Sequence, residues 1–279
     1  MISIAYSPCP NDTFLFYNLV HGNVPGASDV KEELWDVENL NEFAKQGKFP
    51  VTKISFAAYF SVIEKYILLE TGSALGRGCG PMVVRKKGSS ATLLSGDPIL
   101  VPGLLTTANL LLSLHTDGKQ KTIPTRYDLI IPKLLSGEAD LGVIIHEERF
   151  TYEQRGLERV IDLGEWWESE TGLPIPLGAI AIRRDIERNL SLGFQSSLKK
   201  SLELAYQDSD SMYRYIKENS QNKEDDVIKA HIDLYVNNFT MALGDEGQRA
   251  IRILYERAVT AGFVPACPAN TPFFLGEAK

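Results

Sequence analysis

The sequence predicts an α/β protein of two lobes with a cleft between them. Short apolar segments alternate with segments of helical periodicity in both halves of the chain, which is typical of mixed, mostly parallel sheets covered by helices. A polar stretch at residues 86–96, rich in Gly and Ser, separates the first group of elements from the second. A late apolar strand at residues 177–183 is expected to return the chain to the first group.

We therefore expect a discontinuous first lobe, residues 1–87 and 182–279, and an inserted second lobe, residues 88–181. Two connecting strands would form the hinge between them. From residue 190 onward, four segments carry apolar residues three and four positions apart, which predicts helices. A chain of 279 residues is long enough to bury the cores of two lobes without disulfides or metals.

In the first lobe the pattern predicts strands at residues 2–7, 51–55 and 82–85, with helices at 13–20, 37–44 and 57–69. The second lobe is expected to begin with a strand and a tight turn at residues 98–103. Helices at 106–114 and 127–135 follow. The segment 141–145 is apolar almost throughout, which favours a strand buried on both faces of its sheet.

Composition excludes several classes of function. The 29 Lys and Arg residues against 36 Asp and Glu give a net charge of −7, which disfavours nucleic acid as a partner. The cysteines Cys9, Cys79 and Cys267 are odd in number and lack metal-binding spacing. No segment has the features of a signal peptide or a membrane span, so we expect a cytoplasmic protein without a membrane partner.

Candidate site residues follow the predicted strands, because ligands of open α/β sheets bind outside the carboxyl ends of their strands. Short hydroxyl side chains, an amide and one imidazole at these positions predict a small polar site. The residues are Ser7, Asn11, Asp12, Ser55, Ala57, Thr106, Thr107, His146 and Glu147.

Thr106 and Thr107 stand at a predicted helix start, where free N–H groups and the helix dipole favour a carboxylate. The alternative is that one of them only caps the helix. His146 directly follows the buried apolar run and can take up a proton near neutral pH. Its alternative is a structural histidine, hydrogen-bonded in place.

The segment Gly76-Arg77-Gly78-Cys79-Gly80 is not a phosphate-binding loop, because it lacks the required Lys and the helix that follows it. Its glycines are expected to permit tight backbone near the hinge or the cleft. Trp166 and Trp167 are expected to pack in the core, although lining the cleft is an alternative. No motif indicates a metal or a nucleotide, so neither a metal site nor a cofactor is expected.

Several blocks, in the same order along the chain, resemble the 1,4-dihydroxy-6-naphthoate synthases of the futalosine route to menaquinone. The blocks cover residues 7–14, 53–59, 76–81, 102–108 and 144–152, and the similarity continues through 162–167 and 172–178 to 235–237. The resemblance implies the two-lobed fold of type II periplasmic binding proteins. It also implies a carbon–carbon lyase without a cofactor, which converts cyclic dehypoxanthinyl futalosine, a carboxylate, to 1,4-dihydroxy-6-naphthoate and dihydroxyacetone.

By position, the resemblance makes His146 the proton acceptor. Two blocks would supply substrate contacts, namely Lys53, Ile54 and Ser55, and Thr106, Thr107 and Ala108. Asn11 at the end of the first strand is a further candidate.

The alternative functions are chorismate dehydratase of the same pathway and a non-catalytic protein that binds a small acid.

Overall fold

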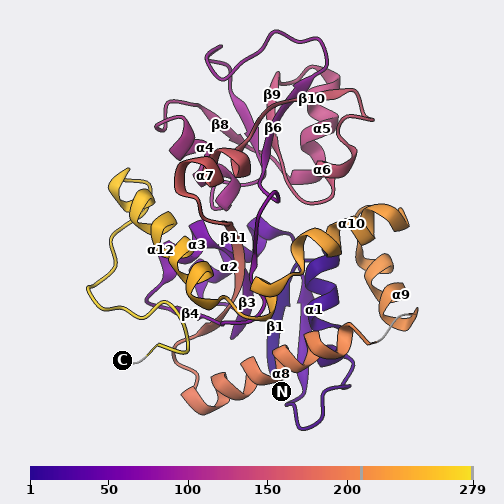
Figure 1. The fold of residues 1–279 in the computed structure, drawn as a ribbon, viewed down its shortest axis with the longest axis vertical. Helices are drawn as coiled ribbons and strands as arrows, with labels where there is room; N and C mark the ends of the chain where they lie inside the picture. The colour runs from indigo at the N-terminus through magenta and orange to yellow at the C-terminus, as the bar shows by residue number, and fades with distance from the viewer. Residues whose placement is uncertain (208–209, 278–279) are drawn as a thin grey trace.

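The computed structural model describes residues 1–207 and 210–277 and contains two mixed β-sheets, each at the centre of one lobe (Figure 1). The first sheet has the strand order β2-β1-β3-β11-β4, with β5 paired to β11. The second has the order β10-β6-β9-β7-β8. The predicted α/β class with two lobes is thereby confirmed.

The first lobe combines the beginning and the end of the chain. Its strands are β1 (Ile2–Tyr6), β2 (Val30–Leu34), β3 (Val51–Ser55), β4 (Tyr66–Leu68), β5 (Ala74–Gly76) and β11 (Ile175–Arg183). Its early helices are α1 (Pro10–Val20), α2 (Val37–Gln46) and α3 (Phe56–Val62). Its late helices are α8 (Arg188–Ala205), α9 (Asp210–Asn219), α10 (Asp225–Tyr235), α11 (Asn238–Met241) and α12 (Gly244–Thr260).

The second lobe is built from the middle of the chain. Its strands are β6 (Met82–Lys86), β7 (Ile99–Val101), β8 (Thr122–Pro124), β9 (Leu141–Ile144) and β10 (Leu157–Asp162). Its helices are α4 (Thr107–His115), α5 (Tyr127–Ser136), α6 (Glu148–Thr151) and α7 (Leu163–Thr171). All four residues of β9 are buried, as the apolar run predicts.

The chain passes between the sheets earlier than the predicted boundaries at 87 and 181. Strand β6 already pairs with β9 and β10 of the second sheet, and β11 pairs along its whole length with strands of the first. The crossings therefore lie at residues 77–81 and before residue 175. The polar stretch 86–96 joins β6 to β7 within the second lobe, because an exposed loop and a linker have the same composition.

Strand directions are more mixed than the sequence predicts. Of the nine strand pairs in the described residues, four are parallel, namely those joining β1, β2 and β3 and those joining β7, β8 and β9. The other five are antiparallel and all involve β6 or β11. These two strands enter their sheets directly from the other lobe, without the crossover helix that a parallel connection needs.

The predicted helix at residues 57–69 is wrong in its second half. Helix α3 ends at Val62, and residues Tyr66 to Leu68 form β4, which pairs with β11. Apolar residues at this spacing fit either structure, and the sheet edge offers hydrogen bonds that outweigh the helical preference. The sequence does not predict strands β2, β5, β8 and β10.

None of the helices in the described part of the chain has the length and apolar character that a membrane span needs.

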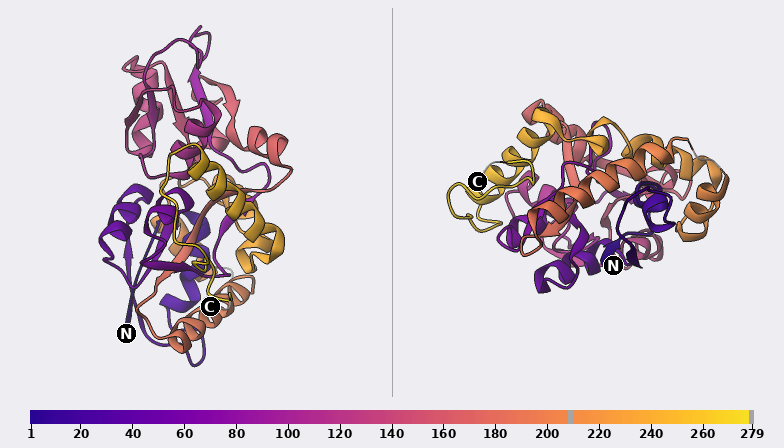
Figure 2. Two further views of the ribbon diagram at one scale, coloured as in Figure 1. Left: turned by 90° about the vertical axis from the view of Figure 1, so that its left-hand side faces the viewer. Right: turned by 90° about the horizontal axis from the view of Figure 1, so that it is seen from below.

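Two of the late helices pack on the first lobe, and a third contacts both lobes. Helix α8 packs on α1, and α10 lies against both α1 and β5 (Figures 1 and 2). Helix α12 contacts β11 and α3 of the first lobe and α4 of the second. Helix α12 is therefore in contact with both lobes.

Candidate active site

A cleft between the lobes encloses about 680 Å³ of empty space, part of it open to solvent. It is lined from below by the ends of β1 and β3, from above by the start of α4 and the end of β9, and at the side by β11. Ten of the residues that the sequence predicts for the site line this cleft: Ser7, Asn11, Asp12, Lys53, Ile54, Ser55, Thr106, Thr107, Ala108 and His146. The other two candidates, Ala57 and Glu147, do not line it.

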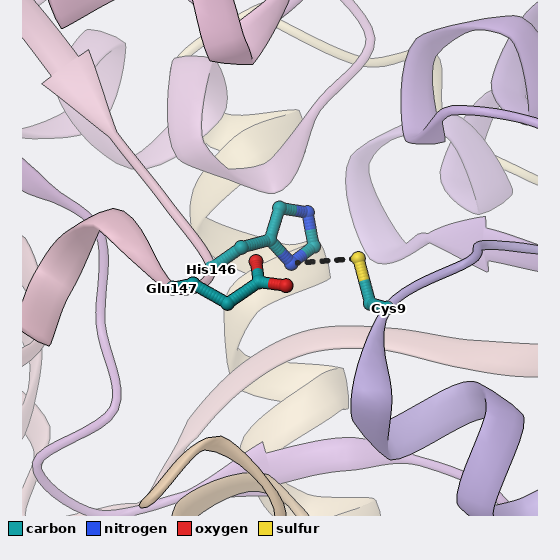
Figure 3. A group of neighbouring side chains, drawn as sticks. All are labelled: Cys9, His146 and Glu147. Atoms are coloured by element: carbon teal, nitrogen blue, oxygen red, sulfur yellow. Dashed lines mark hydrogen bonds between the residues drawn. The ribbon is translucent and has the colours of Figure 1, made fainter. Parts of the chain in front are cut away.

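His146 leaves β9 with a left-handed backbone, at φ +56°, which is uncommon for a residue other than glycine. Its half-buried ring lies between the rings of Tyr127 and His231, at centroid distances of 5.3 and 6.1 Å. The Nδ1 atom lies 3.4 Å from the Sγ atom of Cys9 (Figure 3). Nε2 has no hydrogen-bond partner among the described residues and is not a fully buried atom.

Burial lowers the pKa of His146 to about 4, because removal from water disfavours the charged imidazolium. Asp12 opposes this shift, and Lys53 adds to it. At neutral pH the imidazole is therefore uncharged. A neutral ring with one free nitrogen in the cleft is able to accept a proton from a bound molecule.

Lys53 and Asp12 form a buried ion pair across the floor of the cleft, with Nζ and Oδ1 2.6 Å apart. The Asp12 carboxylate also accepts hydrogen bonds from Ser7 Oγ at 2.7 Å and from Asn11 Nδ2 at 2.9 Å. This set of donors holds the carboxylate in one orientation. The lysine keeps further N–H donors that are able to reach a ligand.

Thr106 is the N-cap of α4: its Oγ1 accepts from Asn109 N at 3.2 Å and donates to Gly103 O at 2.8 Å. The Thr107 hydroxyl donates to Leu177 O at 2.6 Å. Both hydroxyls therefore have partners within the protein. The backbone N–H groups of Thr107 and Ala108 have no acceptor among the described residues, and they remain to bind an anion.

Ser55 ends β3 beside the same helix terminus. Its Oγ accepts a hydrogen bond from Asn41 Nδ2 at 3.1 Å, while Asn41 Oδ1 accepts from the Ser55 backbone N–H at 2.9 Å. The hydroxyl hydrogen of Ser55 is therefore left for an acceptor in the cleft. Ile54 contributes its backbone, since its side chain is fully buried in the core.

Asn11 lies in the cleft but is already tied to its neighbours. Its Oδ1 is 2.9 Å from His231 Nε2, and its Nδ2 donates to Asp12. His231 is 1% exposed and comes from α10, so the C-terminal helices take part in shaping the cleft. A substrate-binding role for Asn11 would use the second hydrogen of its amide.

A family model described as menaquinone biosynthesis matches residues 2–260 of the chain. The chain belongs to this menaquinone-biosynthesis family. It is 44% identical to the 1,4-dihydroxy-6-naphthoate synthase of Thermus thermophilus, over 98% of this chain and 99% of that protein. It is 40% identical to the synthase of Streptomyces coelicolor, over 95% of each chain.

Two solved structures share the architecture of the chain. A crystal structure of an Archaeoglobus fulgidus protein has a TM-score of 0.88 and 35% identity, covering 94% of this chain and 98% of that one. The alkanesulfonate-binding protein of Xanthomonas axonopodis, bound to MOPS, has a TM-score of 0.74 at 12% identity, with 98% of each chain covered. The second match shows the fold alone, that of periplasmic binding proteins, as the sequence predicts.

The glycine-rich block of this menaquinone-biosynthesis protein forms the first crossing between the sheets. A Cβ atom on Gly80 would lie 2.4 Å from Gly164 Cα, so the crossing packs backbone against backbone at the start of α7. Arg77 is half-exposed and pairs with Glu246 at 2.9 Å. Cys79 lines the cleft, but burial raises the pKa of its thiol to about 12, which leaves it unreactive.

The two tryptophans have structural positions. Trp167 is fully buried and donates its indole N–H to Pro174 O at 3.0 Å, which confirms the predicted core packing. Trp166 is partly buried and packs edge-to-face with His115. Neither residue lines the cleft.

The sequence does not predict two of the residues around the imidazole of this menaquinone-biosynthesis protein, Cys9 and His231. It does name Glu147 as a candidate, and the structure places its carboxylate near Cys9. Burial raises the pKa of Cys9, and the charge of the nearby Glu147 adds to this shift. Cys9 is therefore a neutral thiol and not an activated nucleophile. Burial also raises the pKa of Glu147. The Cys9 thiol, a His146 ring nitrogen and a Glu147 carboxylate oxygen lie within 4.8 Å of one another, a donor set that could hold a metal ion.

Proposed function

We propose that this protein is a 1,4-dihydroxy-6-naphthoate synthase, which cleaves cyclic dehypoxanthinyl futalosine to 1,4-dihydroxy-6-naphthoate and dihydroxyacetone in menaquinone biosynthesis. Its family and the names of both curated relatives support this activity. The observation that carries the chemistry is the neutral His146 imidazole, whose Nε2 is free at the end of β9 in the cleft.

In the proposed reaction, Nε2 of His146 removes a hydroxyl proton from the substrate. The ring must then carry its own hydrogen on Nδ1, where it is donated to the Cys9 sulfur 3.4 Å away. Loss of the hydroxyl proton allows the adjacent carbon–carbon bond to break, and the remaining ring becomes aromatic. One well-placed base contributes about 10²–10⁴-fold to such a step, and aromatisation supplies much of the driving force.

The substrate carboxylate would bind at the start of α4. The backbone N–H groups of Thr107 and Ala108 and the Ser55 hydroxyl are the donors left there, and the positive end of the helix dipole favours an anion. Lys53 is the nearest buried cation. Closure of the lobes on the ligand would exclude water and fix the hydroxyl against Nε2.

The alternatives differ from this proposal in their products. Chorismate dehydratase activity and binding without turnover are not favoured, because both curated relatives carry the synthase name. The direct test incubates the purified protein with cyclic dehypoxanthinyl futalosine and, separately, with chorismate, and follows both by mass spectrometry. Release of the naphthoate from the first supports the proposal. Loss of chorismate, or binding without any product, would overturn it.

We also propose that the protein works in the cytoplasm. Cys9, Cys79 and Cys267 are all free thiols, which fits a reducing compartment. Immunodetection after cell fractionation tests this, and recovery of the protein outside the cytoplasmic fraction would contradict it.

A further inference from the structure

Three potential metal ligands meet beside the cleft, and the proposed reaction uses only one of them directly. They are the Sγ atom of Cys9, a ring nitrogen of His146 and a carboxylate oxygen of Glu147, all within 4.8 Å of one another (Figure 3). Cys9 comes from the start of α1 in the first lobe, and the other two follow β9 in the second. The cluster therefore joins the two lobes.

The spacing of the sulfur and the imidazole nitrogen fits a tetrahedral zinc ion. Zn–S and Zn–N bonds of about 2.3 and 2.0 Å, at a tetrahedral angle, place sulfur and nitrogen about 3.5 Å apart. Cys9 Sγ and His146 Nδ1 are 3.4 Å apart. The three donor types, a thiol, an imidazole and a carboxylate, are those that zinc prefers.

The backbone at His146 is what brings two of the donors together. In an extended strand, side chains of successive residues point to opposite faces. The φ of +56° at His146 breaks this alternation, and both His146 and Glu147 project toward Cys9 (Figure 3). Such a backbone costs about 1–3 kcal/mol and persists only where its surroundings impose it.

Glu147 gives the second, independent sign of a ligand. It is only 4% exposed, and its Oε1 atom has no hydrogen-bond partner in the described residues. A buried carboxylate oxygen without a partner is costly, and a cation would satisfy it. Cys9 is the N-cap residue of α1, and its side chain makes no capping hydrogen bond to the helix.

We propose that Cys9, His146 and Glu147 bind a thiophilic divalent cation of the zinc type, and that the bound cation inhibits the enzyme. The fourth coordination position would face the cleft and take water or a ligand oxygen. The thiol proton would leave to solvent on binding. When Nδ1 coordinates the metal, the single hydrogen of the neutral ring lies on Nε2, which is then unable to accept a proton. The inhibition rests on the proposed function, whereas the binding does not.

Cobalt(II) is the probe for the site, because its thiolate complexes absorb in the near ultraviolet and its tetrahedral complexes absorb strongly in the visible. We expect chelator-treated protein to develop both bands to saturation at one equivalent of Co²⁺, and Zn²⁺ to abolish them. Cys9→Ser should lose the thiolate band, and the matched control Cys267→Ser should keep it. Absence of a saturable band in the unmodified protein, or its survival in Cys9→Ser, would overturn the site.

If Cys9→Ser does not fold, Glu147→Gln serves as a second variant, because it keeps the shape of the side chain. Competition with a chromophoric chelator should show Zn²⁺ binding weakened by about tenfold or more, since loss of even an outer partner of a metal site costs 10–100-fold. Unchanged Zn²⁺ affinity in a folded Glu147→Gln protein would remove the carboxylate from the site and contradict the proposal.

Turnover with and without Zn²⁺ tests the inhibition. We expect micromolar Zn²⁺ to suppress naphthoate release, a chelator to restore it, and Cys9→Ser to need at least about tenfold more Zn²⁺ for the same fractional loss of its own activity. A protein that binds Co²⁺ through Cys9 but releases no naphthoate would refute the proposed function and leave the metal site. A turnover rate unaffected by saturating Zn²⁺ would refute the inhibition.

Discussion

The lowered pKa of His146 predicts an enzyme that keeps its activity in mild acid. The perturbation is a change of pH from 7 to 5, over which the protein must remain folded. With a pKa of about 4, only about 9% of the imidazoles carry a proton at pH 5, so kcat/KM should fall by only about 1.1-fold. A histidine with the ordinary pKa of about 6.5 would be about 97% protonated, and kcat/KM would fall about 25-fold.

The assay is the initial rate of naphthoate release at low substrate concentration, measured from pH 4.5 to 8 at constant ionic strength. The sign follows from the direction of the shift: a base with a lowered pKa is active above that pKa and is lost only as the pH falls through it. The acid limb should therefore lie near pH 4, with a flat profile between pH 5 and 7.

Two controls separate titration from unfolding. Circular dichroism at pH 5 should match that at pH 7, and protein held at pH 5 should regain its full rate when returned to pH 7. An acid limb near pH 6.5 in protein that passes both controls would refute the reasoning, because His146 would then be exposed to water like an ordinary histidine.

Two further substitutions test the packing around the cleft. Asp12→Asn leaves the Lys53 ammonium buried without its carboxylate and should lower the free energy of unfolding by about 3–5 kcal/mol in urea titrations. Adding Lys53→Met should restore part of the lost stability. Simple additivity of the two losses would contradict the ion pair. Gly80→Ala places a Cβ 2.4 Å from Gly164 and should lower the stability of the protein by about 1–3 kcal/mol in thermal unfolding. The control Gly193→Ala lies on α8 with open space around its Cβ and should not destabilise the protein. Equal effects of the two substitutions would argue against the close crossing.

The sequence predicts the elements whose signals are local. The alternation of strands and helices, the helix starts at Val37 and near Thr106 and the buried run of β9 all depend on neighbouring residues, and the structure contains each of them. The predictions that failed depend on distant partners. Residues 66–68 form a strand because β11, more than 100 residues later, supplies the hydrogen bonds. The lobe boundary moved because β6 finds both of its partners further along the chain.

The site shows the same division. The rule that polar residues at strand ends form the ligand site correctly brought His146, Asn11 and Thr107 together in space. The roles of these residues remain predictions. That rule does not predict which side chains surround the imidazole of His146. Cys9 lies 137 residues from His146, and His231 reaches Asn11 from a late helix that the apolar spacing predicts without placing it at the site. The reversal of Glu147 toward Cys9 depends on one backbone angle, which no sequence pattern here encodes.

The central claim is that His146 is the base of a naphthoate synthase. Its most direct test replaces His146 with Ala and compares naphthoate release from cyclic dehypoxanthinyl futalosine with that of the unmodified protein, with folding checked by circular dichroism and ligand binding by calorimetry. The account predicts retained substrate binding and a fall in kcat of about 10²–10⁴-fold. A folded His146→Ala protein that releases naphthoate at an undiminished rate would contradict it.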